Sequence, residues 1–354
     1  MKVAPVLRAM TRAQVPFERA LVHTGQHYDK NMSDVFFRDL GIPEPDVHLN
    51  VGSGSHGAQT AKVLALFEEW LLAQATLPRG VVVVGDVNST MACTLAAAKL
   101  TVPVAHVEAG LRSFDRAMPE EINRVVTDAV ADLLLTSEPS GNENLAREGV
   151  DASRVRFVGN VMIDSLVEEL PRARALAMPA RVGFEPGRYA LVTLHRPSNV
   201  DDPARLAALV GFLESASERA PAVFPVHPRT RDRLERYGLL SRVRDNPRIK
   251  LMDPVGYREA VGLMADARYV LTDSGGIQEE TSYLGVPCLT LRHNTERPVT
   301  ATHGTNTVVG DDLDRARALV EDIVEGRYKK GGAIDGWDGH AAERITRALV
   351  EVWG

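Results

Sequence analysis

Short apolar runs alternate with helical segments along this chain, and the alternation limits its possible folds more than any other feature does. Val81–Val84 is a run of four valines, and Tyr269–Thr272 is another short apolar run. Such runs, bounded by turn residues, are typical of strands buried on both faces of a parallel sheet. We also expect a strand at Ala20–Val22 and a helix at Asn31–Leu40. Strands that alternate with helices indicate the α/β class, with a doubly wound parallel sheet.

A glycine-rich turn follows the second run and leads into a helix. Ser274–Gly275–Gly276 precedes Gln278, Glu279 and Glu280, which favour a helix, and Gly285 ends it. The first N–H groups of a helix lack partners within it, so this turn is a ready site for a diphosphate. Ser274 adds a hydroxyl, and Glu280 can accept hydrogen bonds from two sugar hydroxyls. A plain strand-to-helix turn, with acids that favour the helix dipole, is the alternative.

The length predicts two domains. With 354 residues, the chain is long enough for two units that each bury a core. The alternation is less clear over residues 168–186, which are rich in arginine, alanine and proline, and we place the junction there. We expect Rossmann-like, doubly wound domains at residues 1–167 and 168–335. Residues 336–354 are expected to form a C-terminal helix that packs back on one of them, with the N-terminal domain as the candidate.

Composition and charge exclude several classes of protein. The hydrophobic content of 44% and the charged content of 25% are those of an ordinary globular protein. A net charge of −6 argues against non-specific nucleic-acid binding. The two cysteines, Cys93 and Cys288, form neither a zinc motif nor a disulfide framework. No apolar run approaches the ~20 residues that span a bilayer, and we find no secretion signal. We expect a cytoplasmic protein with no nucleic-acid or membrane partner.

Several catalytic motifs are absent from the sequence. It has no G-x-S-x-G, Walker A, H-E-x-x-H or C-x-x-C motif, and no G-x-G-x-x-G nucleotide fingerprint directly after a predicted strand; the G-x-G-x-x-G spacing of Gly52–Gly57 lies in an expected loop. The acids Asp86, Glu108 and Glu120 show no metal-binding spacing. We therefore expect neither a metal nor a nicotinamide cofactor.

Polar residues recur just after the predicted strands. They are Gln26, His27, Asp86, Glu108, His195, His227, Ser274 and Glu296. Ligands of open parallel sheets bind beyond the carboxyl ends of the strands, so two facing domains would direct these residues into one cleft. A lone histidine or aspartate after a strand is more often a turn residue, but the repetition favours a cleft enzyme with a diphosphate-bearing ligand. Carboxylates, with His195 as a titratable partner, suit proton removal or elimination on a sugar ring.

Ordered motifs over nearly the whole chain resemble the non-hydrolysing UDP-N-acetylglucosamine 2-epimerases, which have the two-domain glycosyltransferase-B fold. The matching blocks are His23–Thr24–Gly25–Gln26–His27, Gly85–Asp86, His106–Val107–Glu108–Ala109–Gly110–Leu111–Arg112, Pro119–Glu120–Glu121–Ile122–Asn123–Arg124, Leu194–His195–Arg196, Pro225–Val226–His227–Pro228, Thr272–Asp273–Ser274–Gly275–Gly276–Ile277–Gln278–Glu279–Glu280 and Thr295–Glu296–Arg297–Pro298.

The resemblance implies reversible epimerisation of UDP-GlcNAc to UDP-ManNAc, for cell-surface polysaccharide precursors, by a homodimer. UDP would be eliminated to give a 2-acetamidoglucal and then added back. The implied acid–base residues are Asp86, Glu108 and Glu120, with His195 near the diphosphate. The implied UDP and substrate contacts are Lys2, Ser274, Gly275, Gly276, Glu280 and Arg297.

A second, activating UDP-GlcNAc site is also implied, at Gln26, His27, Lys62, Arg196 and His227. Regulated family members often carry glutamine where Asp29 stands and arginine where Lys62 stands. Lysine does not reproduce a bidentate arginine contact, so activation is a hypothesis here.

The start of the sequence departs from the family. Members open with a strand and a Gly-Thr-Arg-Pro-Glu loop before the lysine of the first helix, whereas this sequence begins at Met1–Lys2. We expect a misplaced start codon or a shortened chain.

Other activities share these motifs or this architecture. They are a UDP-2,3-diacetamido-uronic acid 2-epimerase, a hydrolysing epimerase, a glycosyltransferase and, for a shortened chain, a non-catalytic UDP-sugar-binding protein. Thr295–Glu296–Arg297–Pro298 favours the plain GlcNAc enzymes.

Overall fold

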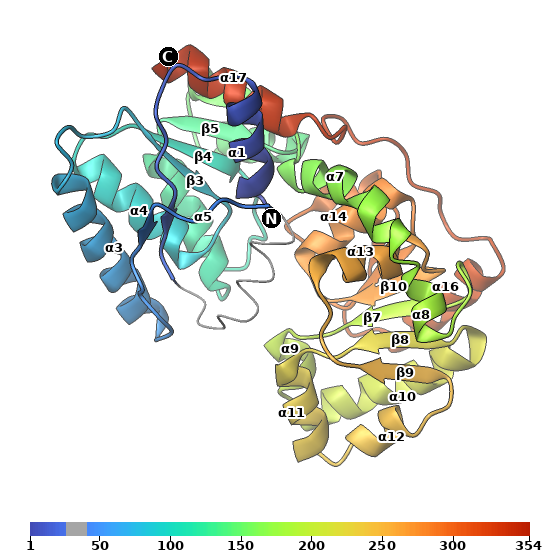
Figure 1. The fold of residues 1–354 in the computed structure, drawn as a ribbon. Helices are drawn as coiled ribbons and strands as arrows, with labels where there is room; N and C mark the ends of the chain where they lie inside the picture. The colour runs from blue at the N-terminus through green and yellow to red at the C-terminus, as the bar shows by residue number, and fades with distance from the viewer. Residues whose placement is uncertain (26–40) are drawn as a thin grey trace. The chain divides into compact units, whose positions relative to one another are not determined.

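The chain folds into two compact α/β units. The computed structural model describes residues 1–25 and 41–354 (Figure 1). One unit comprises Met1–Ser165 and Asp335–Gly354, and the other comprises Leu166–Ile334. Each unit contains a parallel sheet covered by helices, so the predicted fold class is confirmed. The helix expected near residues 31–40 lies outside the described residues.

The first unit is built on a four-stranded parallel sheet in the order β3-β4-β5-β6, with a separate parallel pair, β1-β2. Its strands are β1 (Val22–His23), β2 (Val47–His48), β3 (Val81–Val84), β4 (Val104–Ala109), β5 (Leu133–Thr136) and β6 (Val155–Phe157). Its helices are α1 (Val3–Arg12), α3 (His56–Leu72), α4 (Asn88–Lys99), α5 (Pro119–Val130), α6 (Pro139–Arg147), the short η1 (Ala152–Arg154) and α17 (Ala341–Trp353).

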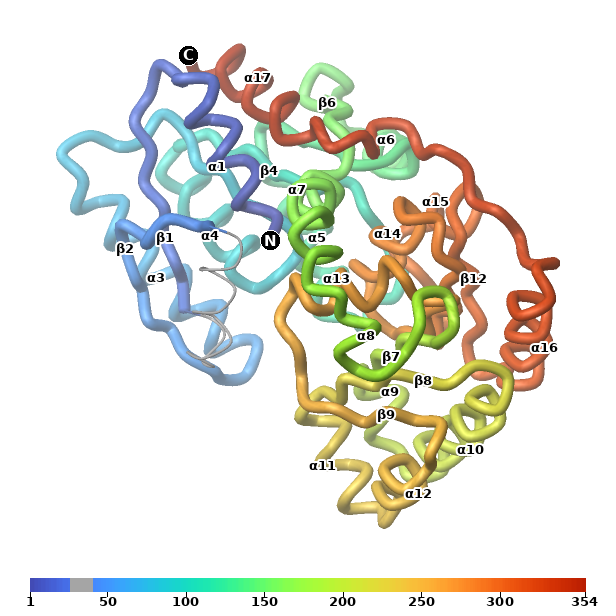
Figure 2. The backbone as a smooth tube through the Cα atoms, turned by 45° about the vertical axis from the view of Figure 1, so that its right-hand side comes forward, coloured from blue at the N-terminus to red at the C-terminus, as the bar shows by residue number. Residues whose placement is uncertain are grey.

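Helices bury both faces of this sheet. Successive residues of a strand point to opposite sides, so neighbouring residues of β5 pack in different cores. Leu134 of β5 packs with α3 and α4, whereas Leu133 and Leu135 pack with α1 and α17. Helices α1 and α17 lie side by side although they are at opposite ends of the chain (Figure 2). The C-terminal helix therefore packs on the N-terminal unit.

The second unit is built on a six-stranded parallel sheet in the order β12-β11-β10-β7-β8-β9. Its strands are β7 (Ala190–Thr193), β8 (Ala222–Pro225), β9 (Ile249–Met252), β10 (Tyr269–Thr272), β11 (Cys288–Thr290) and β12 (Asn306–Val308). Its helices are α8 (Met178–Val182), α9 (Pro197–Val200), α10 (Pro203–Arg219), α11 (Pro228–Arg236), α12 (Leu240–Arg244), α13 (Tyr257–Ala265), α14 (Gly275–Leu284), α15 (Pro298–Thr302) and α16 (Leu313–Val324). Helix α7 (Val161–Ala175) contains the boundary between the units.

The structure differs from the sequence prediction at a strand of the first unit and is more regular than expected in residues 168–186. The strand expected at Ala20–Val22 forms instead at Val22–His23, because the Leu21 N–H donates to the Asp46 carboxylate at 2.7 Å and the ladder with β2 begins one residue later. Residues 168–186, which show no clear strand–helix pattern, are largely helical in α7 and α8, since their alanines and arginines are good helix formers.

Candidate active site

Glu108 occupies an irregular position in β4. The register with β5 shifts between Val107 and Ala109, so Glu108 is the extra residue of a bulge, with a φ of +75°. A left-handed conformation is unusual for glutamate and costs about 1–3 kcal/mol. Its carboxylate is buried and forms an ion pair with the Lys2 ammonium. The bulge therefore directs the Glu108 carboxylate to a lysine at the start of the chain.

Gly85 makes room for this ion pair. It follows β3 with a φ of +76°, which glycine adopts without strain. A Cβ atom at this position would lie 3.2 Å from the Lys2 Nζ and 3.4 Å from the Glu108 Oε2. The Gly85–Asp86 turn thus passes directly beside the pair, which brings Asp86, Glu108 and Lys2 into one cluster.

Asp86 is held by α5. Its Oδ2 accepts from the Arg124 Nη1 at 2.5 Å, and its carbonyl accepts from the Asn123 Nδ2 at 2.9 Å. Arg124 is buried and donates through Nη2 to the Glu121 Oε2 at 2.6 Å. Burial alone would raise the pKa of Glu121, but the Ser113 N–H and the Arg124 guanidinium lower it below its usual range. The aspartate is therefore fixed by a rigid, ionised pair.

Glu120 is the least constrained of the three predicted acids. It lies in the first turn of α5 and is partly exposed. Among residues 1–25 and 41–354, it makes no hydrogen bond or ion pair with another side chain. The structure places it on the helix that holds Asp86 but joins it to neither Asp86 nor Glu108.

The glycine-rich turn in the second unit begins α14 as the sequence predicts. Ser274 precedes the helix, and its N–H donates to the Thr272 Oγ1 at 2.9 Å. Gly275 and Gly276 form the first two positions of a ten-residue helix and are partly exposed. The Glu296 carboxylate lies close by, since its Oε1 is 3.0 Å from where a Cβ of Gly275 would be.

Two arginines of the segment after β11 pair with carboxylates of this region. Arg292 pairs with the Glu296 Oε2 at 2.8 Å, and the Arg297 Nε donates to the Glu279 Oε1 at 2.6 Å. Burial alone would raise the pKa of Glu296, but the charges of Arg292 and Arg297 lower it to about 2. A helix N-terminus with the Arg292 guanidinium close to Gly275 is suited to a phosphate-bearing ligand.

Glu280 is buried inside the second unit. Its Oε1 accepts a hydrogen bond from the Tyr257 hydroxyl at 2.8 Å. Burial raises the pKa of Glu280 to about 8, although the bond from Tyr257 opposes the shift. The carboxyl is therefore largely protonated at neutral pH in the ligand-free protein.

Asp273, which is not among the site residues predicted from the sequence, orients His195. The His195 Nδ1 lies 2.9 Å from the Asp273 Oδ1, and the backbone N–H groups of His195 and Arg196 donate to the same carboxylate. Burial alone would raise the pKa of Asp273, but His195 and the N–H donors lower it. The one signal in the sequence is its position directly after β10.

The predicted second ligand site is only partly described. Gln26 and His27 lie outside the described residues. The His227 ring is 5.6 Å from that of His195, and its pKa is lowered, first by burial and then by the neighbouring His195. Arg196 precedes α9 in the same unit. Lys62 lies on α3 in the first unit and donates to the Val51 carbonyl at 2.8 Å.

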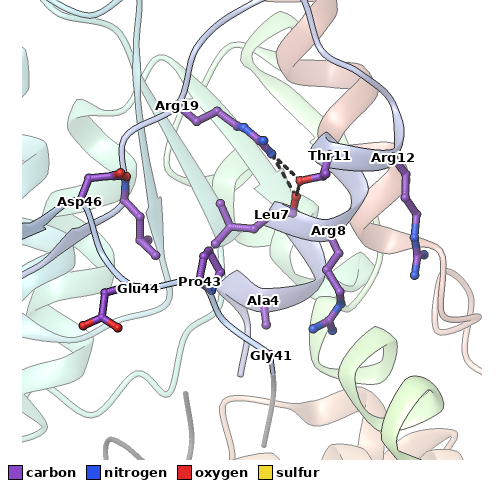
Figure 3. Close-up of a pocket in the computed structure, with 11 residues that line it drawn as sticks. Ala4, Leu7, Arg8, Thr11, Arg12, Arg19, Gly41, Pro43, Glu44 and Asp46 are labelled. Atoms are coloured by element: carbon purple, nitrogen blue, oxygen red, sulfur yellow. Dashed lines mark hydrogen bonds between the residues drawn. The ribbon is translucent and has the colours of Figure 1, made fainter. Parts of the chain in front are cut away.

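A pocket in the first unit contains none of the predicted site residues. Arg8, Arg19 and Asp46 line it beside α1, and the Arg19 guanidinium turns back to the Leu7 carbonyl and the Thr11 hydroxyl (Figure 3). Within the described ranges, no three histidine, cysteine, aspartate or glutamate side chains gather as a metal site. No helix in those ranges is long and apolar enough to cross a membrane.

Known proteins resemble this chain along almost its whole length. Residues 9–350 match the family described as UDP-N-acetylglucosamine 2-epimerase. The UDP-N-acetylglucosamine 2-epimerase of Methanocaldococcus jannaschii is 42% identical over 358 residues, which cover 99% of this chain and 95% of that protein. The UDP-2,3-diacetamido-2,3-dideoxy-D-glucuronate 2-epimerase of Pseudomonas aeruginosa is 41% identical over 355 residues, covering 99% and 96%.

A solved structure shows the same likeness. The crystal structure of the M. jannaschii UDP-GlcNAc 2-epimerase in complex with UDP-GlcNAc and UDP matches with a TM-score of 0.89 at 41% identity, covering 99% of this chain and 96% of that one. The family and the glycosyltransferase-B-type fold class indicated by the motifs are thereby confirmed. This chain belongs to the UDP-N-acetylglucosamine 2-epimerase family and is an isomerase.

Proposed function

We propose that this protein interconverts UDP-GlcNAc and UDP-ManNAc by inverting the sugar at C2. The observation that carries the proposal is the cluster of Asp86, Glu108 and Lys2 at the ends of β3 and β4. It places two carboxylates, each with its own cationic partner, in one part of the first unit. The family match and the UDP-GlcNAc and UDP of the M. jannaschii complex support the choice of ligand.

Elimination and re-addition of UDP account for the inversion. A base removes the C2 proton, the C–H electron pair forms the C1=C2 double bond, and the C1–O bond breaks to release UDP. Protonation of the 2-acetamidoglucal at C2 from the other face, with return of the UDP oxygen to C1, gives the epimer. The C2 proton is weakly acidic, so departure of the anionic diphosphate must share the work.

The second unit is suited to hold that leaving group. We assign the diphosphate to the first turn of α14 at Ser274, Gly275 and Gly276, with Arg297 beside it and the ribose hydroxyls at Glu280. His195, held by Asp273, would donate to the diphosphate as negative charge develops on it. UDP would then stay bound while the glucal exists.

The first unit would carry the proton transfers. Asp86 and Glu108 have different partners, Arg124 and Lys2, and such different surroundings are how two carboxylates acquire separate acid and base roles. Glu120 is the third candidate and keeps the freedom to turn toward a ligand. We assign Lys2 to the neutralisation of Glu108.

Solvent exchange at C2 tests the proposal. Incubation of UDP-GlcNAc in D₂O should introduce deuterium at C2 and yield UDP-ManNAc, both followed by NMR. Asp86→Asn and Glu108→Gln should each lower the rate by about 10²–10⁴-fold, while Glu143→Gln, on an exposed surface pair, should not. Binding of UDP-GlcNAc without exchange would instead indicate a binding protein, and free ManNAc a hydrolysing enzyme.

A uronic acid substrate is the second candidate. The P. aeruginosa relative, a UDP-2,3-diacetamido-2,3-dideoxy-D-glucuronate 2-epimerase, is almost as similar as the M. jannaschii enzyme. The two substrates differ at C3 and at C6, where the uronate carries a carboxylate. Parallel assays of both UDP-sugars would decide the substrate, because the preferred one should have the higher kcat/KM.

A second UDP-GlcNAc is proposed as an activator. His227 and Arg196 lie beside His195, and Lys62 is the further candidate contact. Activation predicts that UDP-ManNAc alone is turned over slowly and that a small amount of UDP-GlcNAc raises the rate. Hyperbolic kinetics with UDP-ManNAc alone would contradict it.

A further inference from the structure

His106 lies in the middle of β4 with its ring completely buried, and both ring nitrogens face acceptors. The Nδ1 is 2.6 Å from the Asp128 Oδ1, and the Nε2 is 2.9 Å from the Gly85 carbonyl oxygen. A carbonyl and a carboxylate only accept hydrogen bonds, whereas a neutral imidazole has a single N–H. Two such bonds therefore require an imidazolium.

The partners of Asp128 keep it ionised, which excludes the arrangement in which Asp128 holds the proton. Its Oδ2 accepts from the Gly110 N–H at 2.9 Å and from the Arg112 Nη1 at 2.7 Å. Arg112 is in turn held by Glu148 through two bonds of 2.8 and 2.7 Å. Burial alone would raise the pKa of Asp128, but His106 and Arg112 lower it.

The charges around the ring act in the same direction. Burial alone would lower the pKa of His106, but the charge and hydrogen bond of Asp128, the Gly85 carbonyl and the charge of Glu108 together raise it. The guanidinium of Arg112, which also contacts Asp128, is paired with the Glu148 carboxylate. Asp128, the Gly85 carbonyl and Glu108 thus all favour the charged form of the His106 ring.

The bond to Gly85 connects this ring to the proposed acid–base cluster. The Gly85 peptide leads directly to Asp86 and passes beside the Lys2–Glu108 pair. We propose that His106 is a positioning residue: as a buried imidazolium it holds the Gly85 carbonyl and so fixes the Gly85–Asp86 turn against Lys2 and Glu108. The inference rests on the proposed function, and the buried ring does not itself reach substrate.

Two substitutions separate the two bonds of the ring. The Nε2 of His106→Gln reaches the position of the histidine Nε2 and keeps a donor to the Gly85 carbonyl. The shorter amide of His106→Asn keeps a donor to Asp128 but does not reach Gly85. If His106 only packed in the core or only bound Asp128, His106→Gln would not be more active than His106→Asn.

The kinetic result expected is a loss in kcat. His106→Asn should lower kcat for UDP-GlcNAc by about 10–100-fold, because a misplacement of about 1 Å near the reacting groups is costly, with KM and the Kd for UDP changed less than about threefold. His106→Gln should recover about fivefold of that loss at equal Tm, which is about the contribution of one hydrogen bond. Equal losses in the two variants, or a normal kcat for His106→Asn, would overturn the proposal.

Protonation of the ring is measured separately on the wild-type protein without ligand. With ¹⁵N-labelled histidine, NMR should show two nitrogen-bound protons on His106 at pH 7, with the signal assigned by its loss in His106→Gln. A ring with a single N–H would overturn the proposal. If the wild-type protein fails to epimerise UDP-GlcNAc, the proposed function fails, while this measurement still decides the charge of His106.

Discussion

Asp273 holds His195 by both its backbone and its side chain, although the two residues are 78 positions apart in the sequence. The same carboxylate accepts from the Arg196 N–H and from the Asn199 Nδ2. One buried anion therefore fixes the loop after β7 and the direction of the imidazole. The proposed contact of His195 with the diphosphate therefore depends on Asp273, which itself need not touch the ligand.

Asp273→Asn tests the orienting role of Asp273, and a second substitution controls for the loss of a negative charge. The NH2 group of the asparagine would face the backbone N–H groups of His195 or Arg196, which also donate. We therefore expect a loss of about 1–3 kcal/mol in the free energy of unfolding. Turnover should fall roughly tenfold or more, because the imidazole loses its fixed partner. Asp201→Asn is the control, since Asp201 holds two arginines at the surface and exposed ion pairs contribute about 0–1 kcal/mol. Chemical denaturation and steady-state kinetics of both variants check this.

Acid should destabilise the protein through Glu296. Its pKa is about 2 in the folded chain, against an ordinary value of 4.5. A lowered folded pKa contributes stability above the unfolded pKa, which is lost as pH falls from about 5 toward 2, and the shift is worth of the order of 3 kcal/mol. Glu296→Gln should therefore show a weaker dependence of Tm on pH in this range. The same slope as in the wild type would contradict the assignment.

Local features of the sequence predicted local structure well. Tyr269–Thr272 is a strand, Gly275 begins the next helix and Gly285 ends it. An apolar run, a glycine at a helix start and a glycine at a helix end are recognised without knowledge of distant contacts. The strand after α1 was predicted two residues too early, because an Asp46 side chain replaces the first bond of its ladder.

Contacts between distant residues were not predictable in this way. The left-handed conformation of Glu108 depends on how β4 pairs with β5, and glutamate itself gives no signal of it. The charge of His106 depends on Gly85 and Asp128, which the fold brings to opposite ends of its ring. Asp273 was visible only as a polar residue after a strand, since its role comes from the β7–β10 pairing. The roles of the site residues themselves remain proposals.

A rise in pH from about 5 to 8 should destabilise the second unit through Glu280. The folded pKa of about 8 lies above the ordinary value of 4.5, so the folded protein binds more protons between these values. The free energy of unfolding should therefore fall as pH rises from about 5 to 8, as Glu280 ionises in the unfolded chain but not in the folded one. Glu280→Gln should remove this loss and be more stable than the wild type at pH 8.

The same substitution should reduce binding of UDP if Glu280 holds the ribose. Calorimetry with UDP should show a Kd that is about two- to tenfold weaker for Glu280→Gln, since the amide has one acceptor oxygen in place of two and a neutral hydrogen bond is worth about 0.5–1.5 kcal/mol. Tyr257→Phe is the matched control, because it removes only the donor that faces Glu280 in the free protein. Unchanged UDP affinity in Glu280→Gln would exclude the ribose contact.

Two glycines in the same unit separate backbone strain from crowding at the acid–base cluster. Gly85 and Gly149 have φ values of +76° and +80°, but only at Gly85 would a Cβ meet other atoms, the Lys2 Nζ and the Glu108 Oε2, whereas nothing lies within 4 Å at Gly149. Alanine at either site should cost about 1–2 kcal/mol of stability through the left-handed backbone. Only Gly85→Ala should also lower kcat, by roughly tenfold or more, because a misplacement of about 1 Å near the reacting groups is costly. Thermal unfolding and C2 deuterium exchange, measured on both variants, should show similar losses of Tm and unequal losses of activity; equal activities would show that the Lys2–Glu108 pair tolerates displacement.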